Sequence, residues 1–233
     1  MDGDSTLTST PIPVSADPIG RRWRLIAGTS AVGAAAFVPF LTASAPGLLT
    51  PPQVATFIAA AAIAAALSAW GGLRFADRAD LPMPLLRAWE RRSALPVNWR
   101  GIASALAVGA AFGVLGILLL GALHAPPLAG SLAIRLASVL FAAVTLETVV
   151  HLLVMSAVVR LSGHVWLGVV AGALAFVLFH ASGSAGLPPA LPLVALATNG
   201  IGGLLFGWLY ARYGFEYLVI AHAAAHLLTV GLG

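Results

Sequence analysis

The chain has 233 residues, of which 60% are hydrophobic and 9% are charged, and its mean hydropathy is +0.97. Soluble globular proteins carry about 25% charged residues, so this composition excludes that class and indicates an integral membrane protein. A helix needs about 20 apolar residues to cross a bilayer, which allows about six to eight spans and leaves no room for a large soluble domain. The absence of cysteine excludes disulfides, thiolate metal sites and a cysteine nucleophile.

Residues 1–20 are rich in Ser, Thr, Pro and Asp and have no apolar period, which predicts a disordered cytoplasmic tail. Residues 21–233 are interpreted as a single membrane domain with an all-α fold. Seven apolar runs predict seven transmembrane helices, at about 25–45, 53–72, 101–124, 132–159, 164–183, 190–211 and 215–232. We expect the last four of these helices to form the functional bundle.

The twelve basic residues are all arginine, and their placement predicts the orientation of the chain. Six of them fall in the loop at 73–100, and only Arg135 lies on the opposite side from the other eleven. Because basic residues favour the cytoplasmic side, we expect a cytoplasmic N-terminus. Part of the arginine-rich loop, residues 81–92, could form a short amphipathic helix at the headgroups. Arginine without lysine, together with abundant alanine, is typical of GC-rich bacterial genomes, so we expect a multi-pass protein of the bacterial cytoplasmic membrane.

Pairs of glycines spaced by four residues occur in three of the predicted spans. This spacing lets helices approach closely and predicts helix packing. No glycine pair is followed by the Lys-Ser/Thr of a phosphate loop, so phosphate binding is not predicted. The expected partners are the lipid bilayer and a membrane-associated protein or peptide, and no nucleic acid is expected.

Glu147 is the only carboxylate deep inside a predicted span, and His151 follows it at i+4, on the same face of a helix. An ionisable group at bilayer depth costs several kcal/mol unless it is paired or faces a polar cavity. Glu147 is therefore a candidate functional residue, and the identity of its partners is the central question.

Further polar residues occur in the following spans. Phe176 and His180 lie at i, i+4 in the fifth predicted helix, Asn199 lies midway along the sixth, and His222 and His226 lie at i, i+4 in the seventh. Each residue taken singly can be a structural contact between helices, and for His151 and Asn199 that interpretation stays open. Taken together, Glu147 and these histidines favour a catalytic or ligand-binding site over a purely structural role.

A carboxylate in a low-dielectric cavity suits a general base that takes a proton from water. Imidazoles of His180 and His222 could stabilise an oxyanion. Alternatively, His180, His222 and His226 could hold a divalent metal such as zinc, since two histidines at i, i+4 are a familiar zinc arrangement. No cofactor is required. No aspartate follows Asp80, so hydrolysis by activated water fits better than a Ser–His–Asp triad.

These residues resemble the CAAX protease and bacteriocin-processing (CPBP, or Abi) family of intramembrane proteases, which includes the type II CAAX prenyl endopeptidases. The family pattern is Glu-Glu-xxx-Arg on one span, Phe-xxx-His on the next, and His-xxx-Asn or His-xxx-Asp on the last. Phe176-xxx-His180 matches the second element, and His222 matches the first position of the third. The resemblance covers about residues 130–230, which are interpreted as the protease-like core.

The chain departs from the pattern at three positions. Leu146 stands at the first glutamate, His151 at the arginine, and His226 at the final Asn or Asp. The resemblance implies an intramembrane endopeptidase with Glu147, His180 and His222 as catalytic residues. His151, His226, Asn199 and Phe176 would support them. Because the glutamate pair is reduced to one, Glu147 would have to take over the activation of water.

Two other classes of function use the same residues. A non-catalytic membrane protein could employ the histidine cluster as a scaffold or to bind metal or haem, since two histidines on facing helices can ligate haem iron. A transporter would be favoured by an inverted repeat between the two halves. The polar residues lie only in the C-terminal half, so the transporter ranks last.

Overall fold

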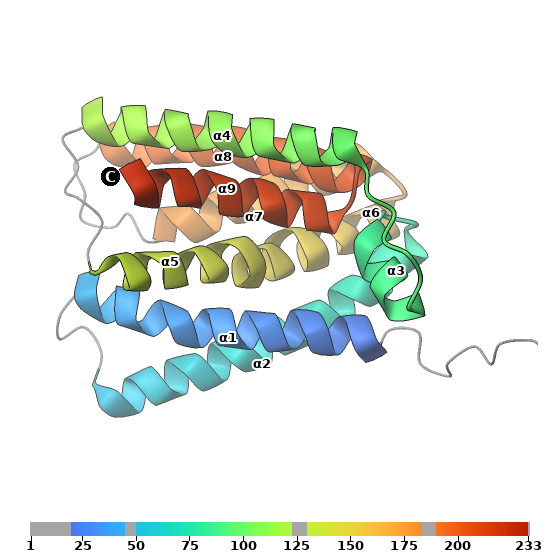
Figure 1. The fold of residues 1–233 in the computed structure, drawn as a ribbon, viewed down its shortest axis with the longest axis horizontal. Helices are drawn as coiled ribbons and strands as arrows, with labels where there is room; N and C mark the ends of the chain where they lie inside the picture. Colours follow the sequence, from blue (N-terminus) through green and yellow to red (C-terminus); the bar gives the residue numbers. More distant parts are fainter. Residues whose placement is uncertain (1–19, 45–49, 123–129, 183–189, 233) are drawn as a thin grey trace, which may run out of the picture.

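The computed structural model describes residues 20–44, 50–122, 130–182 and 190–232, and within these ranges every regular element is helical (Figure 1). The tail predicted at residues 1–20 lies outside the described residues except for Gly20, which begins the first helix. The expected all-α fold is confirmed.

The helix boundaries follow the seven predicted apolar runs. The fourth run is one continuous helix, Leu132–Ser162, which we call the central helix. It consists of α5 (Leu132–Leu140), the π-helical segments η1 (Phe141–Leu146) and η2 (Thr148–Met155), and α6 (Ser156–Ser162). The other helices are α1 (Gly20–Ser44), α2 (Pro51–Arg78), α3 (Pro84–Arg91), α4 (Trp99–Ala122), α7 (Val165–Ser182), α8 (Ala190–Arg212) and α9 (Phe215–Leu232).

Local chemistry explains several helix ends. Thr50 caps α2 through a capping box in which its backbone N–H donates to Gln53 Oε1 at 2.8 Å, and Pro51 starts the helix. Ser131 accepts from the Ile134 backbone N–H and caps α5. The central helix ends at Gly163, whose φ of 73° is the left-handed conformation that glycine adopts without strain.

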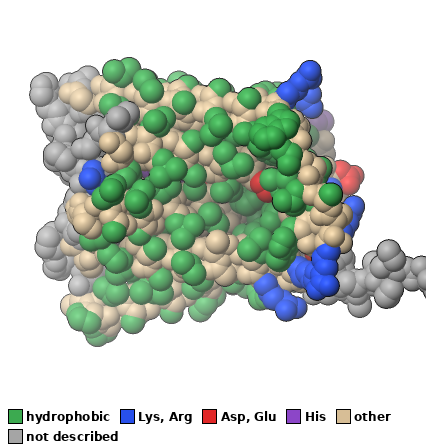
Figure 2. Space-filling view, in the orientation of Figure 1, with side chains coloured by type: hydrophobic (Ala, Val, Ile, Leu, Met, Phe, Trp, Pro, Cys, Tyr) green, Lys and Arg blue, Asp and Glu red, His purple; other side chains and the backbone are tan. Residues whose placement is uncertain are grey.

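The composition and exposure of the helices confirm a polytopic membrane protein. Among the described residues, three helices are long and apolar enough to cross a bilayer, namely Pro51–Arg78, Trp99–Leu119 and Leu132–Ser162, and two shorter apolar helices are Val165–Ala181 and Phe215–Gly231. Large hydrophobic side chains such as Leu118 and Leu178 point outward. Figure 2 shows hydrophobic side chains over the flank of the bundle, with most basic ones gathered at one end.

The central helix lies between two groups of helices (Figure 1). On one side α1 and α2 pack against each other and against η1 and η2. On the other side α4 packs on α9, and α7 packs on α8 and on η2. This arrangement brings the polar residues of the central helix, α7 and α9 into one interior.

The glycine pairs lie at helix contacts, as predicted. A Cβ on Gly113 of α4 would lie 2.8 Å from the Ala225 carbonyl oxygen of α9. A Cβ on Gly203 of α8 would lie 2.7 Å from the Ala173 Cα of α7. Neither neighbour is a flexible side chain, so only glycine permits these separations.

One end of the bundle carries the starts of α1, α4, α7 and α9, the ends of α2, α6 and α8, and the helix α3. We call it the arginine-rich end. The loop predicted at 73–100 starts later than expected, because α2 continues through Arg78. Leu73 and Ala76 are buried there, and Asp77 pairs with the buried Arg22 of α1 at 2.7 Å. The amphipathic helix predicted within 81–92 is present as α3.

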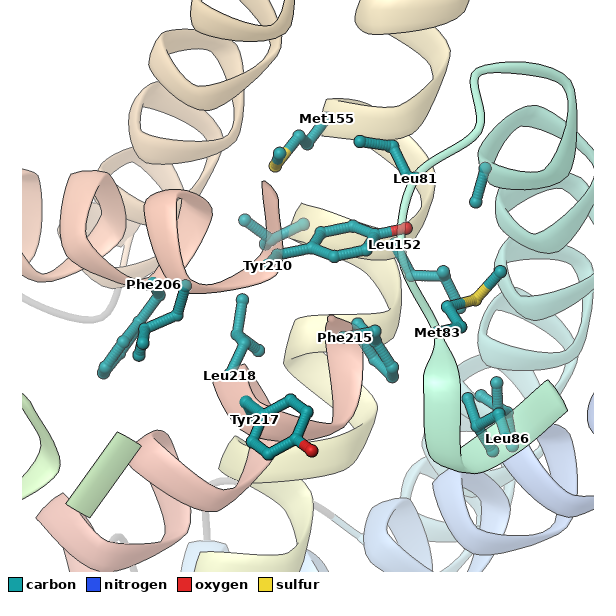
Figure 3. Close-up of a cluster of buried hydrophobic side chains, with 14 of the residues drawn as sticks. Leu81, Met83, Leu86, Leu152, Met155, Phe206, Tyr210, Phe215, Tyr217 and Leu218 are labelled. Atoms are coloured by element: carbon teal, nitrogen blue, oxygen red, sulfur yellow. The ribbon is translucent and has the colours of Figure 1, made fainter. Parts of the chain in front are cut away.

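A buried apolar cluster joins α3 to the rest of the protein (Figure 3). Leu81, Met83 and Leu86 pack in the same cluster as Phe215 and Leu218 of α9. Within the cluster the Tyr210 hydroxyl of α8 lies 2.9 Å from the Ser156 hydroxyl of the central helix. The cluster therefore anchors the arginine-rich end to the bundle.

Candidate active site

Glu147 is fully buried in the central helix, at the junction of the two π-helical segments. Its Oε2 contacts His151 Nδ1 and its Oε1 contacts His222 Nδ1. Each carboxylate oxygen thus meets one imidazole, the first from the same helix and the second from α9. The partner expected from the i, i+4 spacing is confirmed, and His222 joins it from 75 residues away.

His151 is also fully buried and connects Glu147 to α8. Its Nε2 lies 3.2 Å from the backbone carbonyl oxygen of Gly203. A carbonyl oxygen only accepts, so Nε2 carries a proton and donates it. Gly172 of α7 leaves space for the ring, because a Cβ there would lie 2.9 Å from His151 Cδ2.

His222 and His226 form the next link, with their Nε2 atoms 3.0 Å apart. At that separation one ring donates and the other accepts. Because His222 Nδ1 faces a carboxylate oxygen and donates to it, a neutral His222 accepts at Nε2 from His226. Nδ1 of His226 then keeps a free lone pair. His222 is buried and His226 is only half-buried, so the chain of hydrogen bonds runs from the interior toward a more accessible position.

Phe176 lies at the centre of the aromatic contacts of the cluster. Its buried ring lies 4.3 Å from the His180 ring, 5.5 Å from the His222 ring and 6.1 Å from the His151 ring, measured between centroids. The Phe206 ring stacks on His222 at 4.9 Å. These buried rings pack against the imidazoles and restrict their orientation.

His180 is half-buried and does not contact Glu147 directly. Its Nδ1 lies 2.8 Å from the backbone carbonyl oxygen of Phe176, one turn earlier in α7. Nδ1 must therefore carry the proton, and a neutral His180 keeps a free lone pair at Nε2. Such a ring accepts a hydrogen bond or a metal at Nε2, and donates there only when it is protonated.

The hydrogen bonds of the cluster can all be satisfied without net charge. With a carboxylate at Glu147, an imidazolium at His151 and neutral rings at His222 and His226, each hydrogen bond has one donor and one acceptor. Moving a proton from His151 to Glu147 gives an uncharged set with the same hydrogen bonds. Neutrality of the set is what a dry interior requires, because an unpaired buried charge is very costly.

Two expectations from the sequence find less support. Asn199 is half-buried on α8 and makes no hydrogen bond to the cluster among the described residues. No group of three or more His, Asp or Glu side chains in the described ranges is arranged to hold a metal ion. His222 already uses Nδ1 for Glu147 and Nε2 for His226, so the predicted zinc ligands do not fit a metal in this conformation.

Several members of the site carry no signal in the sequence. The Gly203 carbonyl is a backbone group, and nothing in the residue type marks it as the partner of His151. The π-helical segments flanking Glu147 were also not predicted, although such segments are frequent at functional sites. Phe206 alternates with Trp208 and Tyr210, and because a spacing of two does not define one face of a helix, the sequence did not single out Phe206.

Comparison with known proteins gives one match. The family described as type II CAAX prenyl endopeptidase Rce1-like matches residues 126–228, which include Glu147, His151, His180, His222 and His226. Neither the curated proteins nor the solved structures gave a match. The matched segment agrees with the resemblance seen in the sequence motifs. Residues 126–228 are thus similar to the type II CAAX prenyl endopeptidase Rce1-like family.

Proposed function

We propose that this protein is an intramembrane endopeptidase that hydrolyses a peptide bond of a membrane-associated protein or peptide, with Glu147 as the base that activates water. The family supports protease activity in general terms. One observation supports the specific site. Among the described residues, Glu147 is the only fully buried acidic side chain, and it contacts imidazoles from two helices within the matched segment.

The hydrogen-bonded chain provides a route for the proton. The oxygen of a water molecule attacks the scissile carbonyl carbon, and its proton passes to the free Nδ1 of His226. His226 then gives a proton through Nε2 to His222, and His222 gives one through Nδ1 to Glu147. When the carbon–nitrogen bond breaks, the proton returns to the leaving amine. This scheme keeps Glu147 as the final acceptor although its side chain is fully buried.

The tautomer of His180 suggests its role. In its neutral form Nε2 accepts a hydrogen bond, which suits it to orient the attacking water. The oxyanion support that the resemblance implies requires a protonated ring, because Nδ1 is committed to the Phe176 carbonyl. No step of the scheme passes through a metal, since the histidines do not form a ligand set among the described residues.

The family and the placement of the arginines guide the proposal for the substrate and the location. The name of the family points to prenylated peptides as the first substrates to test. We propose the bacterial cytoplasmic membrane, with the N-terminus and the arginine-rich end in the cytoplasm.

Single substitutions test the proposal on protein reconstituted in liposomes with a prenylated peptide or another membrane peptide as substrate. Loss of general-base catalysis lowers the rate by about 10²- to 10⁴-fold, so Glu147→Gln and His222→Ala, which break the proton route, should each nearly abolish cleavage. His180→Ala should also nearly abolish cleavage, because it removes the group that orients the attacking water. The matched control is His164→Ala, which removes an exposed imidazole outside the cluster. Full activity in Glu147→Gln would reject Glu147 as the base.

A second candidate is a non-catalytic membrane scaffold, or a metal- or haem-binding protein, that uses the same cluster. One observation favours it: Glu147 is held between His151 and His222 by hydrogen bonds from both of its oxygens, as it would be in a purely structural contact between helices. A visible absorption spectrum of the purified protein tests haem binding. Metal analysis of the wild type against His222→Ala tests zinc binding.

A further inference from the structure

Three arginines at the arginine-rich end line an open cavity of about 710 Å³ that the proposed catalytic chemistry does not use. The cavity lies between the start of α1, the end of α3 and the segment after α3. Its lining consists of Arg21, Arg24, Trp89, Arg92, Ser93 and Leu95. We propose that this cavity binds the phosphodiester headgroup of an anionic phospholipid.

The charge of the cavity is positive because the nearby carboxylates are already paired. Arg22 is buried and binds Asp77 at 2.7 Å and Glu90 at 2.9 Å, and Arg87 binds Asp77 at 3.2 Å. Two arginines and two carboxylates thus cancel in a neighbouring ionic network. Arg21, Arg24 and Arg92 make no ion pair within the described residues. Three uncompensated guanidinium groups therefore converge on one cavity.

The chemistry of these groups matches a phosphate. The guanidinium group presents its N–H donors in a planar fork that fits phosphate oxygens, often through two parallel hydrogen bonds. Ser93 lies in the same lining, but its hydroxyl donates to the Ala88 carbonyl at 3.3 Å, so the arginines supply the donors for the phosphate. The cavity volume lies within the range of about 300–1,000 Å³ that is usual for small-ligand sites, so a phosphoglycerol headgroup fits.

The position of the cavity, beside the apolar surface of the bundle, favours a lipid over a soluble anion. Arg24 is followed directly by Leu25, an exposed leucine that begins the apolar surface of α1. Trp89 is 44% exposed and Leu95 is 56% exposed, so apolar groups accompany the arginines. Tryptophan prefers the headgroup level of a bilayer, and basic pockets beside membrane helices are typical sites for anionic lipid headgroups.

Lipid binding to the purified full-length protein tests this proposal. The probes are phosphatidylglycerol and phosphatidylcholine with the same acyl chains, supplied to the protein in neutral detergent. An arginine near an anionic lipid is worth about a fivefold change in affinity. The triple variant Arg21→Gln, Arg24→Gln, Arg92→Gln should therefore bind phosphatidylglycerol about a hundredfold more weakly and lose its preference over phosphatidylcholine.

A matched control removes three other exposed arginines from the same end, through Arg91→Gln, Arg100→Gln and Arg160→Gln. This control should keep the preference for phosphatidylglycerol. An equal loss in the two triple variants would overturn the proposal in favour of diffuse surface charge. Inorganic phosphate separates the two sources of the ligand: it should displace the lipid no better than chloride at equal ionic strength, and full displacement would identify a soluble phosphate site instead.

Discussion

Ionisable groups are compensated differently in the interior of the bundle and at its arginine-rich end. In the interior, Glu147 and three imidazoles use one another as partners, so the set can remain neutral. At the arginine-rich end, Arg22 and Arg87 pair with Asp77 and Glu90, yet Arg21, Arg24 and Arg92 have no acidic partner in the part of the chain that the structure describes. The difference reflects the solvent: water and headgroups stabilise an excess charge, whereas hydrocarbon does not.

At the arginine-rich end, the Glu90 carboxyl is partly buried, and this burial changes its pKa. Burial raises the pKa of Glu90, and the positive charge of Arg22 opposes that rise. Asp77 is 27% exposed and Arg87 is 30% exposed, so this ionic network is only partly shielded from water. We therefore expect substitutions in the interior to cost more stability than substitutions at this end.

The largest effect on stability is expected for Glu147→Leu. Leucine removes both acceptors and leaves the Nδ1 atoms of His151 and His222 without partners in a dry interior, at a cost of about 3–5 kcal/mol in the free energy of unfolding. Unfolding of the detergent-solubilised protein measures it. Glu147→Gln is the matched control, because its amide can donate to His151 and accept from His222, so we expect a loss of about 1 kcal/mol or less. Equal losses in the two variants would contradict the described hydrogen bonds.

A smaller loss is expected for Asp77→Ala at the arginine-rich end. The buried Arg22 would lose Asp77 and keep its ion pair with Glu90, and because Asp77 is 27% exposed, water can replace part of its contribution. We expect a cost of about 2 kcal/mol, below the range for an ion pair that is fully buried. The same unfolding measurement compares it with Glu147→Leu. A larger loss for Asp77→Ala than for Glu147→Leu would reverse the ranking of the two regions.

The smallest of the three effects is expected for Gly203→Ala, which tests the support of the cluster from α8. The new Cβ would lie 2.7 Å from Ala173 Cα, so α8 must shift and carry the carbonyl that accepts from His151. We expect a loss of about 1 kcal/mol, at the lower end of the range for overpacking, because α8 can shift. Gly200→Ala on the same helix is the control, because its Cβ would meet only Val177 Cγ2 at an ordinary 3.7 Å. That variant should be neutral or slightly stabilised.

The sequence predicted the fold well because each helix is an apolar run long enough to be recognised alone. The seven runs differ from the helices mainly at two ends: α1 starts at Gly20 and α2 continues to Arg78. The two extensions contain Arg22 and Asp77, which contact each other although they are 55 positions apart in the sequence. A local pattern cannot reveal such a pair.

The candidate site was predicted in its members but not in its connections. The i, i+4 spacing placed His151 beside Glu147, and the family resemblance selected His180 and His222. The order Glu147, His222, His226 in one chain of hydrogen bonds depends on how α9 packs against the central helix. The role of the Gly203 carbonyl depends on the position of α8. These are properties of tertiary packing, and no residue type encodes them.

The most direct test of the central claim uses water labelled with oxygen-18. Wild-type protein and the Glu147→Gln variant are reconstituted with a membrane-protein extract in labelled water, and newly formed carboxyl termini are identified by mass spectrometry. If Glu147 activates water, the wild type produces termini that carry one labelled oxygen and Glu147→Gln produces almost none. The same labelled termini at equal rates in both samples, or none with the wild type, would contradict the account.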